Sequence, residues 1–567
     1  MADTDKTIPS LLQQRVSDTP DAAAFAERDS EGDWQTITWK QFAEKASRIA
    51  LGLVNAGLEP GDELAVLMSN SIDWELIQHA GFMAGCIVIG LDLNDPPDRL
   101  AHIIKRTDIK ALAVESSDML DRFPRSFLAS QRLILDRGSD LPLPPFHQLK
   151  KLEDFPAAPG LSSLPGIKGK DNAVLLFTSG TTGDPKVVLY QHRQLVMAVE
   201  SISRRMSGLP GQPRSACWLP LASPFQRMIN WCGLVLNFKT HMVRDPGALI
   251  PLAGDIRPHF LAGVPRFYEK LHEGICSKIA QLPGIVRFWI AQAEKISRAA
   301  QQGFFIYPCL AVLNPIADIL FFRRIRKVLG GSIRFMISGS APLSKDLLFR
   351  CRAWGFLILE SYGISENIIP MSMNTPEDYG FGTVGKPLAG NLIKISGAGE
   401  ILVKGAGIAG NLAAADRNGF LKTGDLGYFD KKGRLCLTGR QSDTFKLSTG
   451  RKIVPSVIES RLKQIQGVDH AVVTGAGQKY IIALLNIPGW EQMVSGHGSE
   501  SSARRFLQDA AEEATRSLPP YCRPGHCLVI RTPFSIGAGE LTTSLKVRRS
   551  RVLEMHEQKI NSTYKGD

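Results

Sequence analysis

The chain has 567 residues, a formal net charge of +12, and a composition that is 44% hydrophobic and 22% charged. One hydrophobic core stops growing near about 250 to 300 residues, so we expect at least two folding units, and the composition excludes a disordered or fibrous chain. The basic excess is not gathered into the aromatic-containing stripe of a nucleic-acid binder, but it is compatible with anionic ligands or an anionic membrane surface.

The chain begins with "MADTDKTIPSLLQQRV", which carries acids and lacks the apolar core of a signal peptide. Its nine cysteines are irregularly spaced, with no CxxC pair and no Cys/His group at zinc spacing. This pattern argues against a disulfide framework or a structural metal. We therefore expect a cytoplasmic protein with reduced thiols.

The first half of the sequence alternates helix and strand patterns. Residues 39–57 repeat apolar side chains at helical spacing and stop at a glycine. "ELAVLMS" (63–69) and "ALAVES" (111–116) are typical of short buried strands, and 74–91 of a helix that runs through a glycine into another strand. This alternation predicts an α/β fold of parallel sheets covered by helices.

The segment "GFFIYPCLAVLNPIADILFF" (303–322) has the length of a membrane span, but prolines, an asparagine and Asp318 interrupt it. We interpret it as a broken amphipathic helix. Together with the following "RRIRK" (323–327) it is compatible with peripheral membrane contact. A buried helix pair that ends in solvated arginines explains the pattern equally well.

From about residue 380 the sequence becomes short β-rich runs cut by glycines, which suggests a small barrel or twisted sheet. Helix and strand alternation then returns on a smaller scale. With a linker at Gln441–Ser442, we predict a large N-terminal domain, 1–440, of helix-covered sheets with a small β-barrel-like subdomain. A small, mobile α+β domain, 443–567, follows.

A strand pattern runs into a polar loop in "LLFTSGTTGDPKVVLY" (175–190). The residues of this loop that can hold an anion are Thr178, Ser179, Gly180, Thr181, Thr182, Gly183 and Lys186. Glycines let backbone N–H groups close on an anion, hydroxyls add donors and lysine adds charge, so polyphosphate is the natural ligand. Pro185 precedes the lysine and no Ser or Thr follows it, which excludes the P-loop of NTPases. A polar hairpin loop is the alternative.

"FTSGTTGDPK" resembles the phosphate loop of the adenylate-forming superfamily of acyl-CoA synthetases, luciferases and nonribosomal adenylation domains. "RFMISGSAPL" (334–343) resembles the wall of the adenine pocket in that family. The residues at its turn are Gly339, Ser340, Ala341 and Pro342. "ESYGISEN" (360–367) resembles the next family motif and contains Tyr362, Gly363, Ser365 and Glu366. The resemblance implies that Tyr362 stacks on adenine and that Glu366 holds Mg²⁺.

Two further motifs follow in the family's order. "KTGDLGYFDKKGRLCLTGR" (422–440) supplies Asp425, matched to the carboxylate on the ribose hydroxyls, and Arg440 at the end of the large domain. "LTTSLKVRR" supplies Lys546, matched to the mobile catalytic lysine, and Gly450 resembles the glycine that the pantetheine arm of CoA passes. Each residue alone could be an ordinary core or surface residue. Five motifs in order over about 370 residues make that joint explanation untenable.

"GVPRFYEKL" (263–271) and "FGTVGKPL" (381–388) resemble the branch that acts on long-chain fatty acids. The resemblance implies ATP-dependent activation of a medium- or long-chain fatty acid, or another carboxylic acid, to acyl-AMP, then transfer to CoA. It implies ATP, Mg²⁺ and CoA as cofactors or co-substrates. Lys546, Glu366 and Lys186 would act in catalysis, and Glu366 with Thr178 would hold the metal.

The departures from the family lie on the acyl and acceptor side. "PLASPFQR" (220–227) has Ser223 where histidine is usual and Gln226 for glutamate, and the segment before Asp425 is short. Val187 replaces a glycine. These departures leave an acyl carrier protein, an amine or an internal hydroxyl open as acceptors.

Two other classes of function remain as alternatives. One is a luciferase-like oxygenase on the same scaffold. The other is a non-catalytic nucleotide or lipid binder, against which the retention of Lys546, Glu366 and Asp425 argues. Trp231 is consistent with the lining of an acyl tunnel or, as an apolar helix residue, with a core position.

Overall fold

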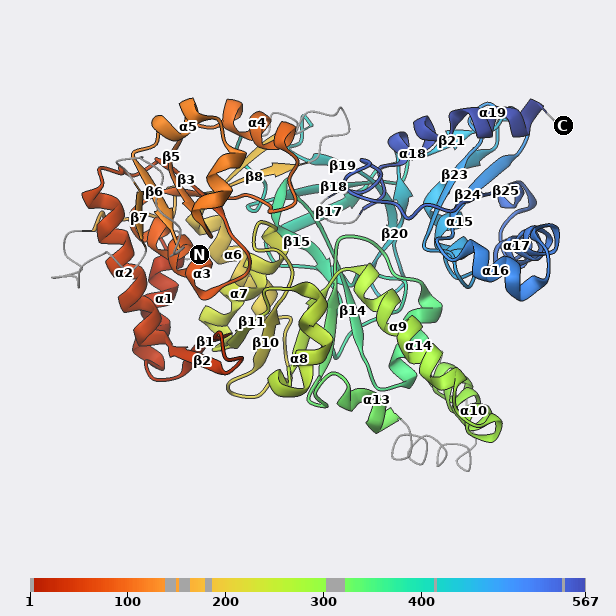
Figure 1. Cartoon of the computed structure of the whole chain (residues 1–567), viewed down its shortest axis with the longest axis horizontal. Coiled ribbons are helices and arrows are strands. Elements are labelled where there is room, and N and C mark those ends of the chain that lie inside the picture. Colours follow the sequence, from red (N-terminus) through yellow and green to blue (C-terminus); the bar gives the residue numbers. More distant parts are fainter. Residues whose placement is uncertain are drawn as a thin grey trace. The chain divides into compact units, whose positions relative to one another are not determined.

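The computed structural model describes residues 5–137, 149–151, 164–178, 186–301, 322–411, 416–542 and 546–565. The chain forms two compact units (Figure 1). Unit 1 comprises Met1–Ile393 and Val403–Leu421, and unit 2 comprises Lys394–Leu402 and Lys422–Asp567. Asp425 and Arg440 therefore belong to the smaller unit, whereas the predicted domain boundary lies at 441–442.

Unit 1 contains a seven-stranded sheet in the order β7-β6-β5-β3-β4-β8-β9. Its strands are β3 (Glu63–Leu67), β4 (Ile87–Gly90), β5 (Ile109–Val114), β6 (Leu133–Asp136), β7 (Leu149–Lys151), β8 (Asn172–Thr178) and β9 (Lys186–Gln191). Neighbouring strands are parallel except for β8 and β9, which form an antiparallel hairpin. The helices that alternate with these strands are α2 (Trp39–Asn55), α3 (Ile72–Met83), α4 (Pro97–Arg106), α5 (Arg125–Ala129) and α6 (His192–Ser203). The predicted α/β alternation is confirmed.

Two further sheets complete the strands of unit 1's α/β part. The first has the order β12-β13-β14-β15-β16, with β12 (Phe260–Gly263), β13 (Phe335–Ser338), β14 (Ile358–Ile364), β15 (Asn367–Met373) and β16 (Lys386–Pro387). The second has the order β10-β11-β1-β2, with β1 (Ala23–Arg28), β2 (Trp34–Thr38), β10 (Arg214–Cys217) and β11 (Lys239–Met242). The accompanying helices are α1 (Ile8–Asp18), α7 (Pro224–Leu236), α8 (Leu249–Ile256), α9 (Pro265–Ala280), α10 (Gly284–Gln301), α13 (Arg323–Lys327) and α14 (Lys345–Ala353).

Helix α3 lies in the middle of the unit 1 core. It packs on α1 and α2, and every residue from Trp74 to Met83 is buried. Three of these buried residues, Glu75, Gln78 and His79, are polar. A buried polar group is costly without a hydrogen-bond partner, so the core must supply partners for them.

The glycine-rich run forms a four-stranded sheet in chain order: β17 (Asn391–Ile395), β18 (Glu400–Gly405), β19 (Leu421–Phe429) and β20 (Leu435–Arg440). The C-terminal part is α+β, as predicted. Its strands are β21 (Phe445–Lys446), β22 (Lys452–Ile453), β23 (His470–Thr474), β24 (Ile481–Asn486) and β25 (Pro524–Ile530). Its helices are α15 (Pro455–Leu462), α16 (Trp490–His497), α17 (Glu500–Thr515), α18 (Arg549–Met555) and α19 (Glu557–Lys565).

Within the described part of the chain, no helix combines the length and apolar character that crossing a bilayer requires. Of the predicted broken amphipathic segment, 303–322, all residues except Phe322 lie outside the described residues. The basic run that follows it forms the short helix α13.

Candidate active site

The predicted phosphate loop closes an antiparallel hairpin. Thr178 ends β8, Lys186 begins β9, and the two residues are paired in register. They therefore stand opposite each other where the loop leaves the sheet. A P-loop instead joins a strand to a helix, so the hairpin agrees with the exclusion made from the sequence. Ser179, Gly180, Thr181, Thr182 and Gly183 lie outside the described residues.

The strand that begins at Lys186 is held by a side chain from far along the sequence. In the described sheet, β9 is an edge strand. The amide of Asn411 donates to the carbonyl of Val187 at 2.9 Å and accepts from the N–H of Leu189 at 3.3 Å. Asn411 thus satisfies two backbone groups that a further strand would otherwise pair. Asn411 is not among the site residues predicted from the sequence.

The turn between β14 and β15 carries the predicted metal ligand, and β9 contacts this turn. The hydroxyl of Tyr190, on β9, donates to the carbonyl of Ser365. Burial raises the pKa of Tyr190 well above its usual value, and the nearby Glu366 carboxylate raises it further. The N–H of Ala409 donates to the carbonyl of Glu366 at 3.1 Å. The structure thus joins the Glu366 turn to the strand that starts at Lys186.

The predicted adenine wall is a tight turn at the carboxyl end of β13. Gly339 is buried, and a Cβ atom there would lie 3.3 Å from the ring of Phe225. Ser340 has a φ of 78°, in the left-handed region. Such a conformation costs a non-glycine residue about 1 to 3 kcal/mol, and it recurs at functional sites. Ser340, Ala341 and Pro342 are exposed, so the turn presents its backbone to solvent.

Tyr362, on β14 beside this turn, is buried, whereas Gly363 and Ser365 are exposed. Strand β14 runs parallel to β13. In open α/β sheets, ligands bind outside the carboxyl ends of parallel strands. The two motifs that the resemblance assigns to adenine therefore share one edge of the sheet.

Glu360 is a buried carboxyl behind the same turn. Its Oε1 accepts a hydrogen bond of 3.0 Å from the N–H of Leu343, the residue that follows Pro342. Burial raises the pKa of Glu360 to about 7, although this hydrogen bond opposes the shift. The carboxyl therefore fixes the end of the turn to β14.

Three predicted site residues belong to unit 2, and their charges act on one another. Asp425 and Arg440 are cross-strand partners on β19 and β20, and Nε of Arg440 lies 3.0 Å from Oδ1 of Asp425. Lys546 keeps contact with solvent. Desolvation by surrounding protein lowers its pKa, Arg440 lowers the pKa further, and Asp425 opposes both. The charges of Arg440 and Asp425 thus act on Lys546, although more than 100 positions separate it from them in the sequence.

Gly450 lies in the turn between β21 and β22. Its N–H donates to the carbonyl of Leu447 at 2.9 Å, and its φ is 76°. A Cβ atom at this position would meet no atom within 4 Å. The backbone conformation alone therefore favours glycine here, and the space beside it is open. The role of Gly450 toward pantetheine stays a prediction.

The residue Ser223, which departs from the family, directly precedes α7. Gln226, in the first turn of this helix, accepts from the N–H of Leu219 at 3.2 Å and donates to Asn230 at 2.9 Å. Asn230 in turn donates to Glu75 at 2.7 Å. The substituted glutamine thus couples the segment before α7 to the buried polar residues of α3.

Arg227 is completely buried between two tryptophans. Its guanidinium carbon lies 5.2 Å from the ring centroids of both Trp74 and Trp231. Burial lowers the pKa of Arg227 to about 9, although the nearby Glu75 opposes this shift. Burial also raises the pKa of Glu75 to about 7. Trp231 is only 2% exposed. It occupies the core position that was one of the two sequence interpretations.

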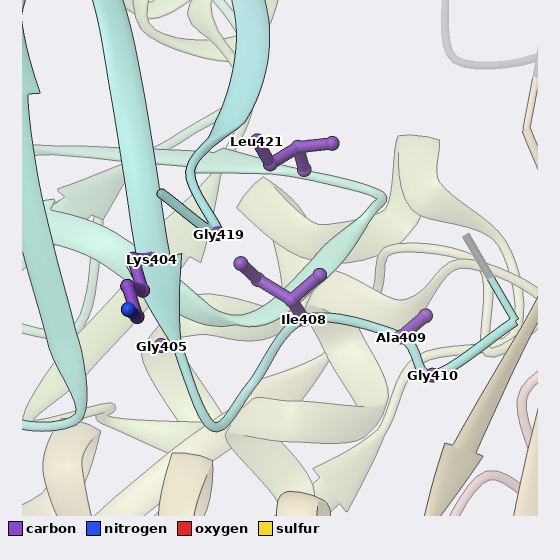
Figure 2. Close-up of a pocket in the computed structure, with 7 residues that line it drawn as sticks. All are labelled: Lys404, Gly405, Ile408, Ala409, Gly410, Gly419 and Leu421. Atoms are coloured by element: carbon purple, nitrogen blue, oxygen red, sulfur yellow. The ribbon is translucent and has the colours of Figure 1, made fainter. Parts of the chain in front are cut away.

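A hollow of about 330 Å³ opens next to the segment that carries Asn411 (Figure 2). Its lining residues are Lys404, Gly405, Ile408, Ala409, Gly410, Gly419 and Leu421. Lys404 is the charged member, and its ammonium group donates to the carbonyl of Asn418 at 3.1 Å. The lining contains none of the residues predicted for the site, so we do not assign the chemistry to this hollow.

The chain matches the models of two protein families. Residues 12–412 match the model of the AMP-binding enzyme family, and residues 442–567 match that of the AMP-binding enzyme C-terminal domain. The chain belongs to the AMP-binding enzyme family. The first match contains the phosphate-loop, adenine-wall and Glu366 motifs, and the second contains Gly450 and Lys546. Asp425 and Arg440 lie between the two matches.

Among individual relatives of this AMP-binding enzyme is the long-chain-fatty-acid–CoA ligase FadD15 of Mycobacterium bovis. It is 26% identical, over 98% of this chain and 97% of the relative. The adenylation domain of carboxylic acid reductase from Segniliparus rugosus, in complex with AMP and a co-purified carboxylic acid, has a similar fold, with a TM-score of 0.76, 18% identity and coverage of 99% and 94%. O-succinylbenzoate coenzyme A synthetase from Bacillus subtilis, in complex with ATP and magnesium, gives a TM-score of 0.69 at 22% identity and covers 96% of this chain and 99% of that one.

One predicted metal ligand, Glu366, is a carboxylate of the kind that magnesium binds. Among the described residues, no three His, Cys, Asp or Glu side chains gather around a common point. Mg²⁺ keeps several waters and is commonly bound by one or two carboxylates together with substrate phosphates. Glu366, partly exposed on its turn, fits that requirement.

Proposed function

We propose that this enzyme activates a medium- or long-chain fatty acid with ATP to acyl-AMP and pyrophosphate, and then transfers the acyl group to CoA. The observation that carries the proposal is the cross-strand pair of Asp425 and Arg440, whose charges act on Lys546. In this proposal Lys546 is the cation for the reacting carboxylate and phosphate, and Asp425 is the carboxylate that binds the ribose. The names of the relatives support the choice of acid and acceptor.

In the first step, a carboxylate oxygen of the acid attacks the α-phosphorus of ATP, and the bond to pyrophosphate breaks. Negative charge grows on the phosphate oxygens, and Lys186 and Lys546 stabilise it as preorganised cations. Mg²⁺, held by Glu366 and Thr178 when ATP is bound, would neutralise further phosphate charge. Asp425 orients the ribose, while Tyr362 and the turn Gly339–Pro342 contact the adenine.

In the second step, the sulfur of CoA attacks the acyl carbonyl carbon, AMP leaves, and the thiol gives up its proton. We propose that the pantetheine arm passes Gly450, where the space beside the backbone is open. Movement of the C-terminal domain, 443–567, between the two steps is part of the proposal.

The test is ATP–pyrophosphate exchange with a panel of carboxylic acids of increasing chain length, repeated with CoA. We expect exchange with medium or long acids, and acyl-CoA only when CoA is added. Lys546→Ala should lower exchange about 100-fold or more, whereas Lys431→Ala, at an exposed hairpin lysine, should not change it. Normal exchange by Lys546→Ala would refute the mechanism. Exchange without thioester would reject CoA and favour an acyl carrier protein or another acceptor.

A further inference from the structure

Helix α10 carries large apolar side chains that the hydrophobic core does not bury. Ile290 and Ala293 are each 2% exposed and belong to the hydrophobic cluster beneath the helix. Ile285, Phe288 and Trp289 are 71%, 56% and 46% exposed. Their spacing of three and four residues places them on one face, about a third of a turn from the core face. Three adjacent large apolar side chains in solvent mark an interaction surface.

The chain around this face is basic. No Asp or Glu occurs in residues 274–293 or 319–345. The basic residues in these two stretches are Lys278, Arg287, Arg323, Arg324, Arg326, Lys327, Arg334 and Lys345. Phe322 and Leu329, which flank α13, belong to the same hydrophobic cluster as Ile290, so both stretches lie in one part of unit 1. Figure 1 shows both α10 and α13 in the lower part of that unit.

Nearby acids have basic partners of their own. Asp346, on α14, pairs with Arg298 at 2.8 Å. Glu294 accepts a hydrogen bond of 2.8 Å from the indole of Trp354 and lies 3.4 Å from Arg350. These two carboxylates therefore do not neutralise the basic residues of the two stretches.

We infer that the face formed by Ile285, Phe288 and Trp289 docks on an anionic lipid bilayer. A tryptophan and a phenylalanine insert well at the level of lipid headgroups, and surrounding lysines and arginines are attracted to acidic headgroups. The docking does not depend on the proposed reaction. With that reaction, it would bring the enzyme to the phase in which long-chain acids dissolve.

The test is flotation of the full chain with vesicles of phosphatidylcholine alone and of phosphatidylcholine mixed with phosphatidylglycerol. We expect binding to the mixed vesicles only, and weaker binding as salt is raised. The variant Ile285→Gln/Phe288→Gln/Trp289→Gln should need about tenfold more lipid or lose binding altogether. Phe506→Gln, at an exposed phenylalanine of α17, is the matched control and should bind like the natural chain.

Three results would overturn the inference. The triple variant could bind the mixed vesicles like the natural chain. It could unfold at a clearly lower temperature, which would show that the face packs inside the protein. Light scattering could show a dimer that the triple variant breaks, which would make a second copy the partner. Pyrophosphate exchange with a short, water-soluble acid and no lipid reports separately on the proposed reaction.

Discussion

Arg440 donates a hydrogen bond of 3.0 Å from Nε to Oδ1 of Asp425, directly across the pairing of β19 with β20. The carboxylate is buried, while the arginine is exposed. The hydrogen bond therefore orients the carboxylate, and the guanidinium is a cation whose charge acts on Lys546. Arg440 thus binds Asp425, which is predicted to hold the ribose, and its charge acts on Lys546, which is predicted to be catalytic.

Replacement of Arg440 by glutamine should shift the pH dependence of catalysis. Arg440 lowers the pKa of Lys546, so its removal should raise that pKa. The ammonium form would then persist to higher pH, and the alkaline limb of the pyrophosphate-exchange profile should move upward. Arg434→Gln, which removes a comparable pair with Asp430 on the same hairpin, serves as control. Identical alkaline limbs for Arg440→Gln and the natural chain would contradict the coupling.

Asn411→Ala should weaken ATP binding. Loss of both hydrogen bonds to β9 leaves the strand that begins at Lys186 less constrained. We expect the KM for ATP to rise about tenfold, since two such bonds contribute about 1 to 2 kcal/mol together. The KM for the acid should stay constant. Asn411→Asp keeps the acceptor for Leu189 but not the donor to Val187, so it should give a smaller increase. Equal changes in both KM values would indicate a general structural defect.

Glu360→Gln should remove one source of pH-dependent stability. The folded protein holds the Glu360 proton up to a pKa of about 7, whereas the ordinary value is 4.5. The stability that this proton contributes is present at acidic pH and is lost as pH rises through about 7. As pH rises from mildly acidic to mildly alkaline, the free energy of unfolding of the glutamine variant should increase by about 2 kcal/mol relative to that of the natural chain. If the melting temperatures of the variant and the natural chain change equally with pH across that range, the assignment is rejected.

Arg227→Met should destabilise the core of unit 1. It removes the donor to Gln78 and leaves Glu75 without its nearby cation. Breaking a buried charge pair on one side typically costs about 3 kcal/mol, and urea unfolding measures it. The loss should be greater above pH 7, where Glu75 is ionised, than below. Arg204→Met, at a residue 71% exposed, should change stability little. A pH-independent loss would show that packing between the tryptophans dominates.

The α/β alternation and the motif series were predictable because helix period, strand composition and the motifs are local. The residues that position the site were not. Asn411 acts on backbone groups 224 and 222 residues away. The left-handed conformation of Ser340 has no sequence signal, because serine rarely adopts it. The partners of Glu75 and Arg227 depend on the packing of α3 beside α7, which no local sequence pattern predicts.

The Asn411 amide has a second consequence for β9. An edge strand with unpaired N–H and C=O groups is a template on which another polypeptide can add a strand. Asn411 occupies the carbonyl of Val187 and the N–H of Leu189, which are the two groups that such a strand would use first. The same side chain that holds the start of β9 thereby opposes edge-to-edge pairing of this strand with another polypeptide.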